Sequence, residues 1–369
     1  MPSAEPYHTR GGVQKTKSYG ITFKYLRGTP GETGFGSKST AEQVSAGWDG
    51  SRYVALVTGA ATGLGYESAR VLALRGAHVV VAVRTQARAE ETADRLRRDV
   101  PGAKVTPLEL DLSSLASVRQ AADAFRRSGL PLNILLLNAG VMATPAFTPS
   151  RDGFELQWAT NHLGHFALTQ RLKDLLISSA TTSGLEGRVV VLSSMGHYLF
   201  EVPGGVDFEA LRSGKNYVPF NAYGVSKLCN VLFTRELQRQ LTGKPVVAVC
   251  CHPGAIFDTD LKRHMAGVSS NSEGGSGGKS CSLQGLALSL TFMMMKPVTK
   301  TIPQGTSTQM LLATAPRVEA GEYYSDCNVA PSSAASQDGD LGARLWEFSE
   351  QAVRAEEEAA AATPAPGTA

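Results

Sequence analysis

The sequence lacks the features that stabilise disulfide scaffolds, metal-binding domains and membrane spans. Its cysteines number 5 and have no paired spacing, which argues against a disulfide framework and favours a reducing compartment. No CxxC pair or His/Cys cluster has metal-site spacing, so we expect no metal. No apolar run approaches the ~20 residues that a membrane-spanning helix needs.

An excess of charge of one sign is also missing. The chain has 36 basic and 33 acidic residues, a net charge of +3, which is too even to indicate a nucleic-acid partner. A hydrophobic content of 42% and a charged content of 19% are typical of a globular protein. The 369 residues suffice for one large domain or two ordinary ones.

The two ends of the chain differ in composition from its body. Residues 1–48 are predicted to be an N-terminal extension, and residues 1–33 are basic with Glu5 and Glu32 as their only acids. That composition fits either an organelle transit peptide or a disordered basic arm. Residues 353–369 are predicted to be a disordered, solvated tail.

From residue 53 onward, short apolar runs alternate with longer amphipathic segments. Continuous apolar strands separated by helices indicate a parallel sheet covered on both faces. We therefore predict an α/β fold over residues 49–352, a single Rossmann-type doubly wound domain with a mostly parallel seven-stranded sheet flanked by helices. A Gly/Ser-rich stretch at about 267–281 is predicted to be a flexible insertion within it. The expected strands are 53–59, 78–83, 104–112, 133–140, 187–194, 245–254 and 321–326.

A glycine-rich turn follows the first expected strand. Its glycines have the spacing G-x-x-x-G-x-G, which lets the backbone turn tightly and approach a pyrophosphate. The helix that follows offers unpaired N–H groups to phosphates at its N-terminus. This turn predicts a dinucleotide site formed by Gly59, Ala61, Thr62, Gly63, Leu64 and Gly65.

The residue after the second strand distinguishes the two dinucleotides. An acid there would bind the ribose 2′-hydroxyl of NAD. This chain has Arg84 instead, and a guanidinium can pair with a 2′-phosphate. We predict NADP(H) as the cofactor; the alternative is that Arg84 is a solvated charge beside the site.

The next two strands also end in residues that face the expected crevice. Asp111 and Leu112 end the third strand, and Asn138, Ala139 and Gly140 end the fourth. Ligands of doubly wound sheets bind at the carboxyl ends of the strands, so these positions are expected to contact the cofactor. Asp111 could also cap the following helix.

Chemistry is indicated by a Tyr and a Lys four residues apart. Tyr223 and Lys227 lie on one face of an expected helix, where a nearby ammonium would lower the pKa of the phenol. A phenol tuned in this way can exchange a proton near neutral pH. Ser194 ends the fifth strand at the same crevice, and Asn161 is a polar residue within an apolar helical pattern, where it needs a partner.

Taken in order, these motifs resemble the short-chain dehydrogenase/reductase family. The resemblance implies that Tyr223 is the general acid/base and that Lys227 holds the nicotinamide ribose and lowers the pKa of the phenol. It also implies that Ser194 orients the substrate carbonyl and that Asn161 holds a water of the proton relay. Pro253 and Gly254 are added as cofactor contacts. The motifs are T-G-x-x-x-G-x-G (58–65), D-L (111–112), N-A-G (138–140), N-H-L-G-H-F (161–166), S-S (193–194), Y-x-x-x-K (223–227) and H-P-G (252–254).

Within the family, several segments are similar to narrower groups. N-H-L-G-H-F and the segment 302–308 resemble retinol dehydrogenases and WW-domain oxidoreductases. Segments 34–47 and 72–84 resemble the plant short-chain dehydrogenases associated with the chloroplast inner-envelope translocon. That resemblance implies NADPH binding and a plastid envelope address; the alternative location is the cytoplasm. A calmodulin-binding role is not carried over, because the amphipathic segment 342–358 is acidic at its end.

These observations support two hypotheses of different classes. The first is an NADP(H)-dependent oxidoreductase that transfers a hydride between the nicotinamide and a lipophilic carbonyl or alcohol, retinal-like or apocarotenoid-like. The apolar segment 285–295 could line its substrate pocket, lie in a membrane interface or be a core helix. The alternative is an NADPH-binding, redox-sensing subunit of a chloroplast envelope protein-import complex. The sequence is compatible with peripheral membrane association and with a homo-oligomer, and it decides neither.

Overall fold

The computed structural model describes residues 23–256 and 299–362. Their centre is an eight-stranded sheet in the order β3-β2-β1-β4-β5-β6-β7-β8, with every pair parallel except β7 and β8. The predicted mostly parallel Rossmann-type sheet is confirmed. The strands are β1 (Val54–Thr58), β2 (His78–Val83), β3 (Val105–Glu109), β4 (Ile134–Leu137), β5 (Gly187–Leu192), β6 (Val246–His252), β7 (Tyr323–Ser325) and β8 (Asn328–Val329).

The predicted count of seven strands is wrong by one short edge strand. β8 has two residues and returns antiparallel to β7 through a turn at Asp326 and Cys327, both with positive φ. No apolar run marks so short a strand in the sequence. The strand order changes direction between β1 and β4, and that position opens a crevice at the carboxyl ends of the strands.

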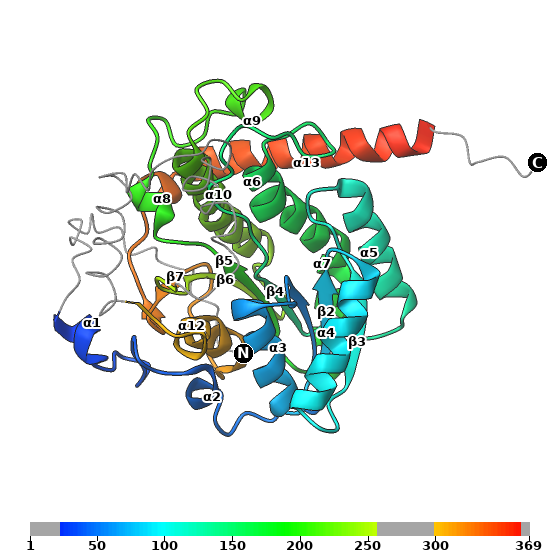
Figure 1. The fold of residues 1–369 in the computed structure, drawn as a ribbon, viewed down its shortest axis with the longest axis vertical. Coiled ribbons are helices and arrows are strands. Elements are labelled where there is room, and N and C mark those ends of the chain that lie inside the picture. The colour runs from blue at the N-terminus through cyan, green and yellow to red at the C-terminus, as the bar shows by residue number, and fades with distance from the viewer. Residues whose placement is uncertain (1–22, 257–298, 363–369) are drawn as a thin grey trace, which may run out of the picture.

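Helices cover both faces of the sheet (Figure 1). Alternate residues of each strand enter opposite cores: Val57 packs with α3 and α12, whereas Leu56 packs with α5, α7 and α10. This burial on both faces explains why the strands are continuously apolar. The principal helices are α3 (Gly63–Leu74), α4 (Gln86–Asp99) and α12 (Ile302–Thr314) on one face, and α5 (Leu115–Arg127), α7 (Gly164–Ser183), α10 (Pro219–Gln240) and α13 (Gly339–Ala362) on the other.

Shorter helical segments complete the described chain. They are α1 (Phe23–Arg27), α2 (Ala41–Val44), α6 (Leu156–Trp158), the π-helix η1 (Ala159–Leu163), α8 (Gly196–Leu199), α9 (Ala210–Ser213) and the 3₁₀ helix η5 (Ala335–Gln337). In the part of the chain that the structure describes, no helix, long or short, has both the length and the apolar character needed to cross a membrane.

Part of the N-terminal extension packs against the domain. Helix α2 buries Ala41 and Val44 beside α3 and α12. Further along the fold, Asn328 of β8 accepts hydrogen bonds from the backbone and hydroxyl of Thr33, both at 3.2 Å. The extension is therefore ordered where it meets the domain. Residues 1–22 lie outside the described residues, so the transit-peptide and basic-arm alternatives stay predictions.

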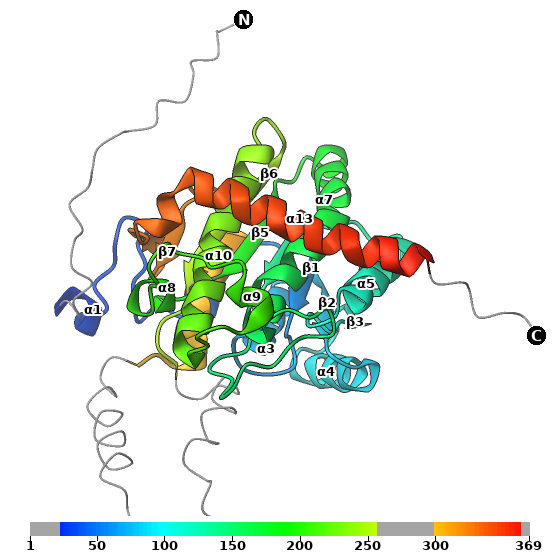
Figure 2. The same ribbon diagram turned by 90° about the horizontal axis from the view of Figure 1, so that it is seen from above.

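The C-terminal tail predicted to be disordered from residue 353 is helical through Ala362, which corrects that boundary. Helix α13 lies across α10, α7 and α5 (Figure 2). Trp346 packs against Phe166 and Phe233, and Glu356 pairs with Arg119 at 3.1 Å. The acidic run that suggested a solvated tail therefore supplies ion pairs to the domain. The Gly/Ser-rich insertion and the segment 285–295 lie outside the described residues.

Candidate active site

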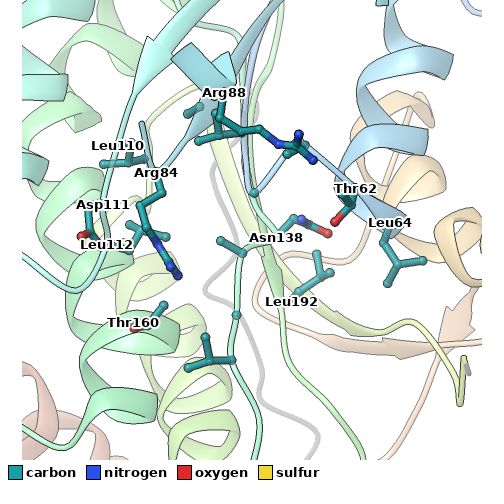
Figure 3. Close-up of a pocket in the computed structure, with 18 of the residues that line it drawn as sticks. Thr62, Leu64, Arg84, Arg88, Leu110, Asp111, Leu112, Asn138, Thr160 and Leu192 are labelled. Carbon is teal, nitrogen blue, oxygen red and sulfur yellow. The ribbon is translucent and has the colours of Figure 1, made fainter. Parts of the chain in front are cut away.

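A cavity of about 490 Å³ lies at the carboxyl ends of the central strands (Figure 3). It is large enough for a small-molecule ligand. The structure brings all of the predicted cofactor residues to its wall except Gly65 and Gly254. Those that line it are Gly59, Ala61, Thr62, Gly63, Leu64, Arg84, Asp111, Leu112, Asn138, Ala139, Gly140, Tyr223, Lys227 and Pro253.

The glycine-rich loop is a close-packed cradle at one end of the cavity. Gly59 has φ +67°, and a Cβ there would lie 2.9 Å from the Cα of Ala139. A Cβ on Gly65 would lie 2.2 Å from the carbonyl oxygen of Gly59. Gly65 does not line the cavity, but its missing side chain lets the first turn of α3 pack directly behind the loop. The loop keeps backbone N–H groups accessible at a helix N-terminus, which fits a dinucleotide pyrophosphate.

Thr58, at the end of β1, ties this loop to the end of β4. Its hydroxyl oxygen accepts hydrogen bonds from the backbone N–H groups of Asn138 at 2.9 Å and Ala139 at 3.0 Å. The Asn138 amide in turn donates to the carbonyl oxygen of Thr58 at 2.9 Å. The sequence analysis did not select Thr58, although it begins the T-G motif. Its role is visible only once β1 and β4 are known to be neighbours.

Two arginines line the cavity from the side of β2 and α4. Arg84 follows β2 as predicted, and Arg88 joins it from the first turn of α4, which is capped by Thr85. Figure 3 shows Arg84 directed toward the middle of the cavity and Arg88 toward the loop that carries Thr62. Arg88 was missed because a basic residue early in a charged helix resembles an ordinary surface residue. Its spacing one turn after Thr85 was the available signal.

Asp111 lines the cavity and also shapes the turn before α5. Its carboxylate accepts hydrogen bonds from the backbone of Ser113 at 3.0 Å and from the Ser113 hydroxyl at 2.7 Å. The cap of α5 is Ser114, whose hydroxyl accepts from the backbone of Ser117 at 3.3 Å. The alternative of Asp111 as the helix cap is therefore wrong.

Tyr223 and Lys227 lie on one face of α10, as their spacing predicted. The ammonium of Lys227 lies 5.8 Å from the centroid of the Tyr223 ring and donates to the carbonyl oxygen of Leu192 at 3.0 Å. Ser194 lies beside the phenol and is hydrogen-bonded to it, and a Cβ built on Gly196 would touch both side chains. A substrate oxygen placed here could accept hydrogen bonds from the hydroxyl and the phenol, with the ammonium behind the phenol ring.

Burial governs the protonation of this pair. It raises the pKa of Tyr223 above its ordinary value, while the hydrogen bond with Ser194 acts in the opposite direction. It lowers the pKa of Lys227 to about 8. The expectation of a lowered phenol pKa is therefore wrong for the protein alone, because desolvation of the phenolate outweighs the hydrogen bond with Ser194.

Asn161 is fully buried in the π-helix η1 and does not line the cavity. Its side-chain oxygen accepts from the backbone N–H of Val141 at 2.8 Å. Its amide donates to the carbonyl oxygen of Val141 at 3.0 Å and to the hydroxyl of Ser226 at 2.9 Å. Asn161 thus has the partners that a buried amide needs, and it joins the loop after β4 to the helix of Tyr223. π-Helical turns of this kind are frequent at functional sites.

Comparison with known proteins places this geometry in a family. A family model described as short chain dehydrogenase matches residues 53–267. The chain belongs to the short-chain dehydrogenase family. A solved structure of an uncharacterised protein from Mycobacterium paratuberculosis is similar to it with a TM-score of 0.60 and 32% identity, covering 84% of this chain and 97% of that one.

Three curated relatives in this family match the groups that the sequence resembled. A short-chain dehydrogenase of Brassica napus, TIC 32 B, chloroplastic, is 39% identical over 88% of this chain and 96% of its own length. The human WW domain-containing oxidoreductase is 34% identical over 87% of this chain and 72% of its own. Human retinol dehydrogenase 12 is 37% identical over 80% of this chain and 84% of its own. The predicted resemblance is confirmed.

The short-chain dehydrogenase site also contains residues that the sequence analysis missed. Most are apolar or backbone contributors that no single motif marks, and their place at the wall follows from the sheet order. They are Ala82, Val83, Thr85, Arg88, Leu110, Val141, Thr160, Leu192 and Ser193.

Proposed function

We propose that this short-chain dehydrogenase is an NADP(H)-dependent reductase of a lipophilic carbonyl, with alcohol oxidation as the reverse reaction. The observation that carries the proposal is the convergence of Ser194, Tyr223 and Lys227 beside a glycine-lined cavity that Arg84 and Arg88 also line. The cavity residues fit a nicotinamide dinucleotide, since the glycines leave room for backbone to approach phosphates. When bound, the nicotinamide supplies the hydride.

Each side chain has a task that its environment supports. Ser194 donates a hydrogen bond to the carbonyl oxygen and polarises it. Tyr223, whose pKa is raised by burial, stays protonated at neutral pH and donates its proton to that oxygen as the carbonyl carbon is reduced. Lys227 holds the nicotinamide ribose and provides positive charge near the phenol as that proton leaves. Asn161 positions the loop of Val141 and the helix of Tyr223.

The choice of NADP(H) rests on Arg84 and Arg88. No acid follows β2 directly to bind a ribose 2′-hydroxyl, and two guanidinium groups line the cavity instead. A planar guanidinium can bind a phosphate through two charge-assisted hydrogen bonds. The pair would therefore favour a 2′-phosphate over a hydroxyl.

The proposal of a lipophilic substrate rests on exposed apolar side chains close in sequence to Ser194 and Tyr223. Leu199 is 63% exposed on α8, which follows Ser194, and Phe220 is 38% exposed in the first turn of α10, ahead of Tyr223. The ring of Phe200 packs against Phe220 at 5.2 Å between centroids. Exposed apolar side chains grouped beside a site mark contact with an apolar partner. The similarity to retinol dehydrogenase 12 supports the same substrate class.

For location, the proposal is a chloroplast, with peripheral association at the inner envelope. Its support is the similarity to the chloroplastic dehydrogenase of Brassica napus. A role as an NADPH-binding, redox-sensing subunit of an envelope import complex is the alternative on the same similarity.

The test is NADPH oxidation by the purified protein with a panel of long-chain and retinoid-like aldehydes and ketones. Tyr223→Phe should abolish turnover by at least ~100-fold while NADPH still binds, because it removes only the proton donor. Tyr66→Phe is the matched control, since Tyr66 lies on α3 outside the cavity wall and binds Asp99. Tight NADPH binding without turnover on any member would contradict the reductase and support the redox-sensing subunit.

A further inference from the structure

His165 is a fully buried polar side chain for which the proposed chemistry has no task. It lies in the first turn of α7, directly after the π-helix that contains Asn161. Its Nδ1 lies 3.0 Å from the carbonyl oxygen of Asn161, and its Nε2 lies 2.9 Å from the hydroxyl of Thr58. The imidazole thus connects the backbone of Asn161 to Thr58, the residue that organises the nucleotide-binding loop.

The two contacts fix the tautomer of His165. A carbonyl oxygen only accepts, so Nδ1 must carry a proton and donate to Asn161. The hydroxyl oxygen of Thr58 already accepts from the backbone of Asn138 and Ala139, so the hydroxyl acts as a donor toward its remaining neighbours. Two acceptors lie within reach of its proton, the carbonyl oxygen of Leu136 at 3.4 Å and Nε2 of His165 at 2.9 Å, and the shorter contact favours Nε2. Each group in this series of hydrogen bonds therefore has one consistent role as donor or acceptor.

The surroundings keep the imidazole neutral. Burial lowers the pKa of His165 to about 3, and the positive charge of Lys227 acts in the same direction. A second proton on Nε2 would also confront a Thr58 oxygen whose lone pairs are taken. His165 is therefore no proton donor at physiological pH, and its function must depend on geometry.

We propose that His165 is a positioning residue that locks the π-helical turn of Asn161 to the nucleotide-binding loop through Thr58. Asn161 in turn positions the loop after β4 and the helix α10 through its hydrogen bonds to the Val141 backbone and the Ser226 hydroxyl. Ser226 lies next to Lys227 in the sequence, and its hydroxyl donates to the carbonyl oxygen of Tyr223 at 2.7 Å. Cofactor seating and the alignment of the Tyr223 helix are then set by one hydrogen-bonded chain. The NADPH-binding and turnover parts of its test rest on the proposed function, whereas the NMR measurement does not.

The chain offers a matched control in His162. It is equally buried, burial also lowers its pKa to about 3, and its Nε2 lies 3.0 Å from the hydroxyl of Ser349 in α13. His162 faces away from the cavity toward the aromatic rings of Trp158 and Phe233. Replacing either histidine by Leu removes one buried imidazole of the same chemistry, so a purely structural role predicts the same outcome for both.

The experiment compares His165→Leu, His165→Asn and His162→Leu in the full chain. NADPH binding is measured by fluorescence titration, with kcat and KM for any carbonyl of the panel that turns over. We expect His165→Leu to weaken NADPH binding and to lower kcat by about tenfold or more each, as loss of two buried hydrogen bonds implies. His165→Asn places an amide where Nδ1 donates, so it should recover most of kcat but less of the binding. His162→Leu should lower the melting temperature and leave both quantities within about twofold.

If the variants fail to fold, a measurement on the wild-type protein still tests the proposal. In ¹⁵N-imidazole NMR, the signal of His165 should show a neutral ring protonated at Nδ1 and should not titrate between about pH 5.5 and 8.5, roughly 1.5 units either side of neutrality. An Nε2-protonated ring, a titrating ring, or equal effects of the two Leu variants would overturn the proposal. Absence of turnover in the wild type would contradict the proposed reductase but leave the NMR and binding results to decide on His165.

Discussion

The ion pair between Lys300 and Asp326 supports a quantitative prediction. The Lys300 side chain is 2% exposed, and its ammonium lies 2.6 Å from the carboxylate of Asp326, which is 28% exposed. Its methylene groups lie against Gly254, and its backbone N–H donates to the carbonyl oxygen of Ala255 at 2.9 Å. Among the described residues, Asp326 is its only recorded side-chain partner. The pair therefore joins the H-P-G segment to the turn between β7 and β8.

Asp326→Asn removes the negative charge and leaves the ammonium buried. Breaking a buried pair from one side costs about 3–5 kcal/mol. Water reaches the carboxylate side, so we expect a loss of about 2–4 kcal/mol in the free energy of unfolding. At about 2.1 cal/mol/K per residue over roughly 300 residues, this lowers the melting temperature by about 3–6 °C. Asn tolerates the positive φ of this position as Asp does, so backbone strain does not contribute.

The assay is thermal and urea unfolding followed by circular dichroism. Adding Lys300→Met to Asp326→Asn should recover most of the lost stability, because methionine fills the same space without a charge. A loss below about 0.5 kcal/mol in Asp326→Asn, or a double variant no more stable than it, would refute the reasoning.

Three further predictions concern the cofactor cavity and the N-terminal extension. Gly65→Ala should weaken NADPH binding by about 100-fold, measured by calorimetry, because its Cβ would displace the loop at Gly59. NADPH affinity should be constant at lower pH and fall above about pH 8 as Lys227 loses its proton, and fluorescence titration of Lys227→Met should show a weaker affinity without that fall. Asn328→Ala should leave the melting temperature nearly unchanged but speed proteolysis within residues 29–38, since it removes the bonds to Thr33, and mass spectrometry would locate the cleavage.

The sequence was sufficient for the parts of the fold that depend on local pattern. The glycine spacing after β1, the apolar strands and the Tyr223–Lys227 spacing each have a local physical cause, and each lies in the structure where it was predicted. The direction of the pKa shift at Tyr223 was wrong, because spacing indicates a neighbouring charge but not the extent of burial.

Other features depend on contacts between distant segments and left little trace in the sequence. Thr58 and His165 are 107 residues apart, and neither has a distinctive neighbourhood without the other. The acidic end of α13 resembles a solvated tail until Arg119 and Arg171 are placed beside it. Residues of this kind are polar groups whose partners are supplied by topology, so local composition alone suggests exposure.

The position of α13 has a consequence for the order in which the protein forms. The face of the sheet covered by α5, α7 and α10 is completed by a helix whose Glu356 pairs with Arg119, 237 residues earlier. The ribosome must synthesise the chain past residue 357 before these contacts can form. Strands β1, β2 and β3 around the glycine-rich turn are synthesised much earlier and can pair before then. Such distant contacts slow folding and leave Trp158, Phe166 and Phe233 uncovered in the meantime. Until α13 is synthesised, a nascent chain of this protein therefore presents these aromatic side chains to chaperones.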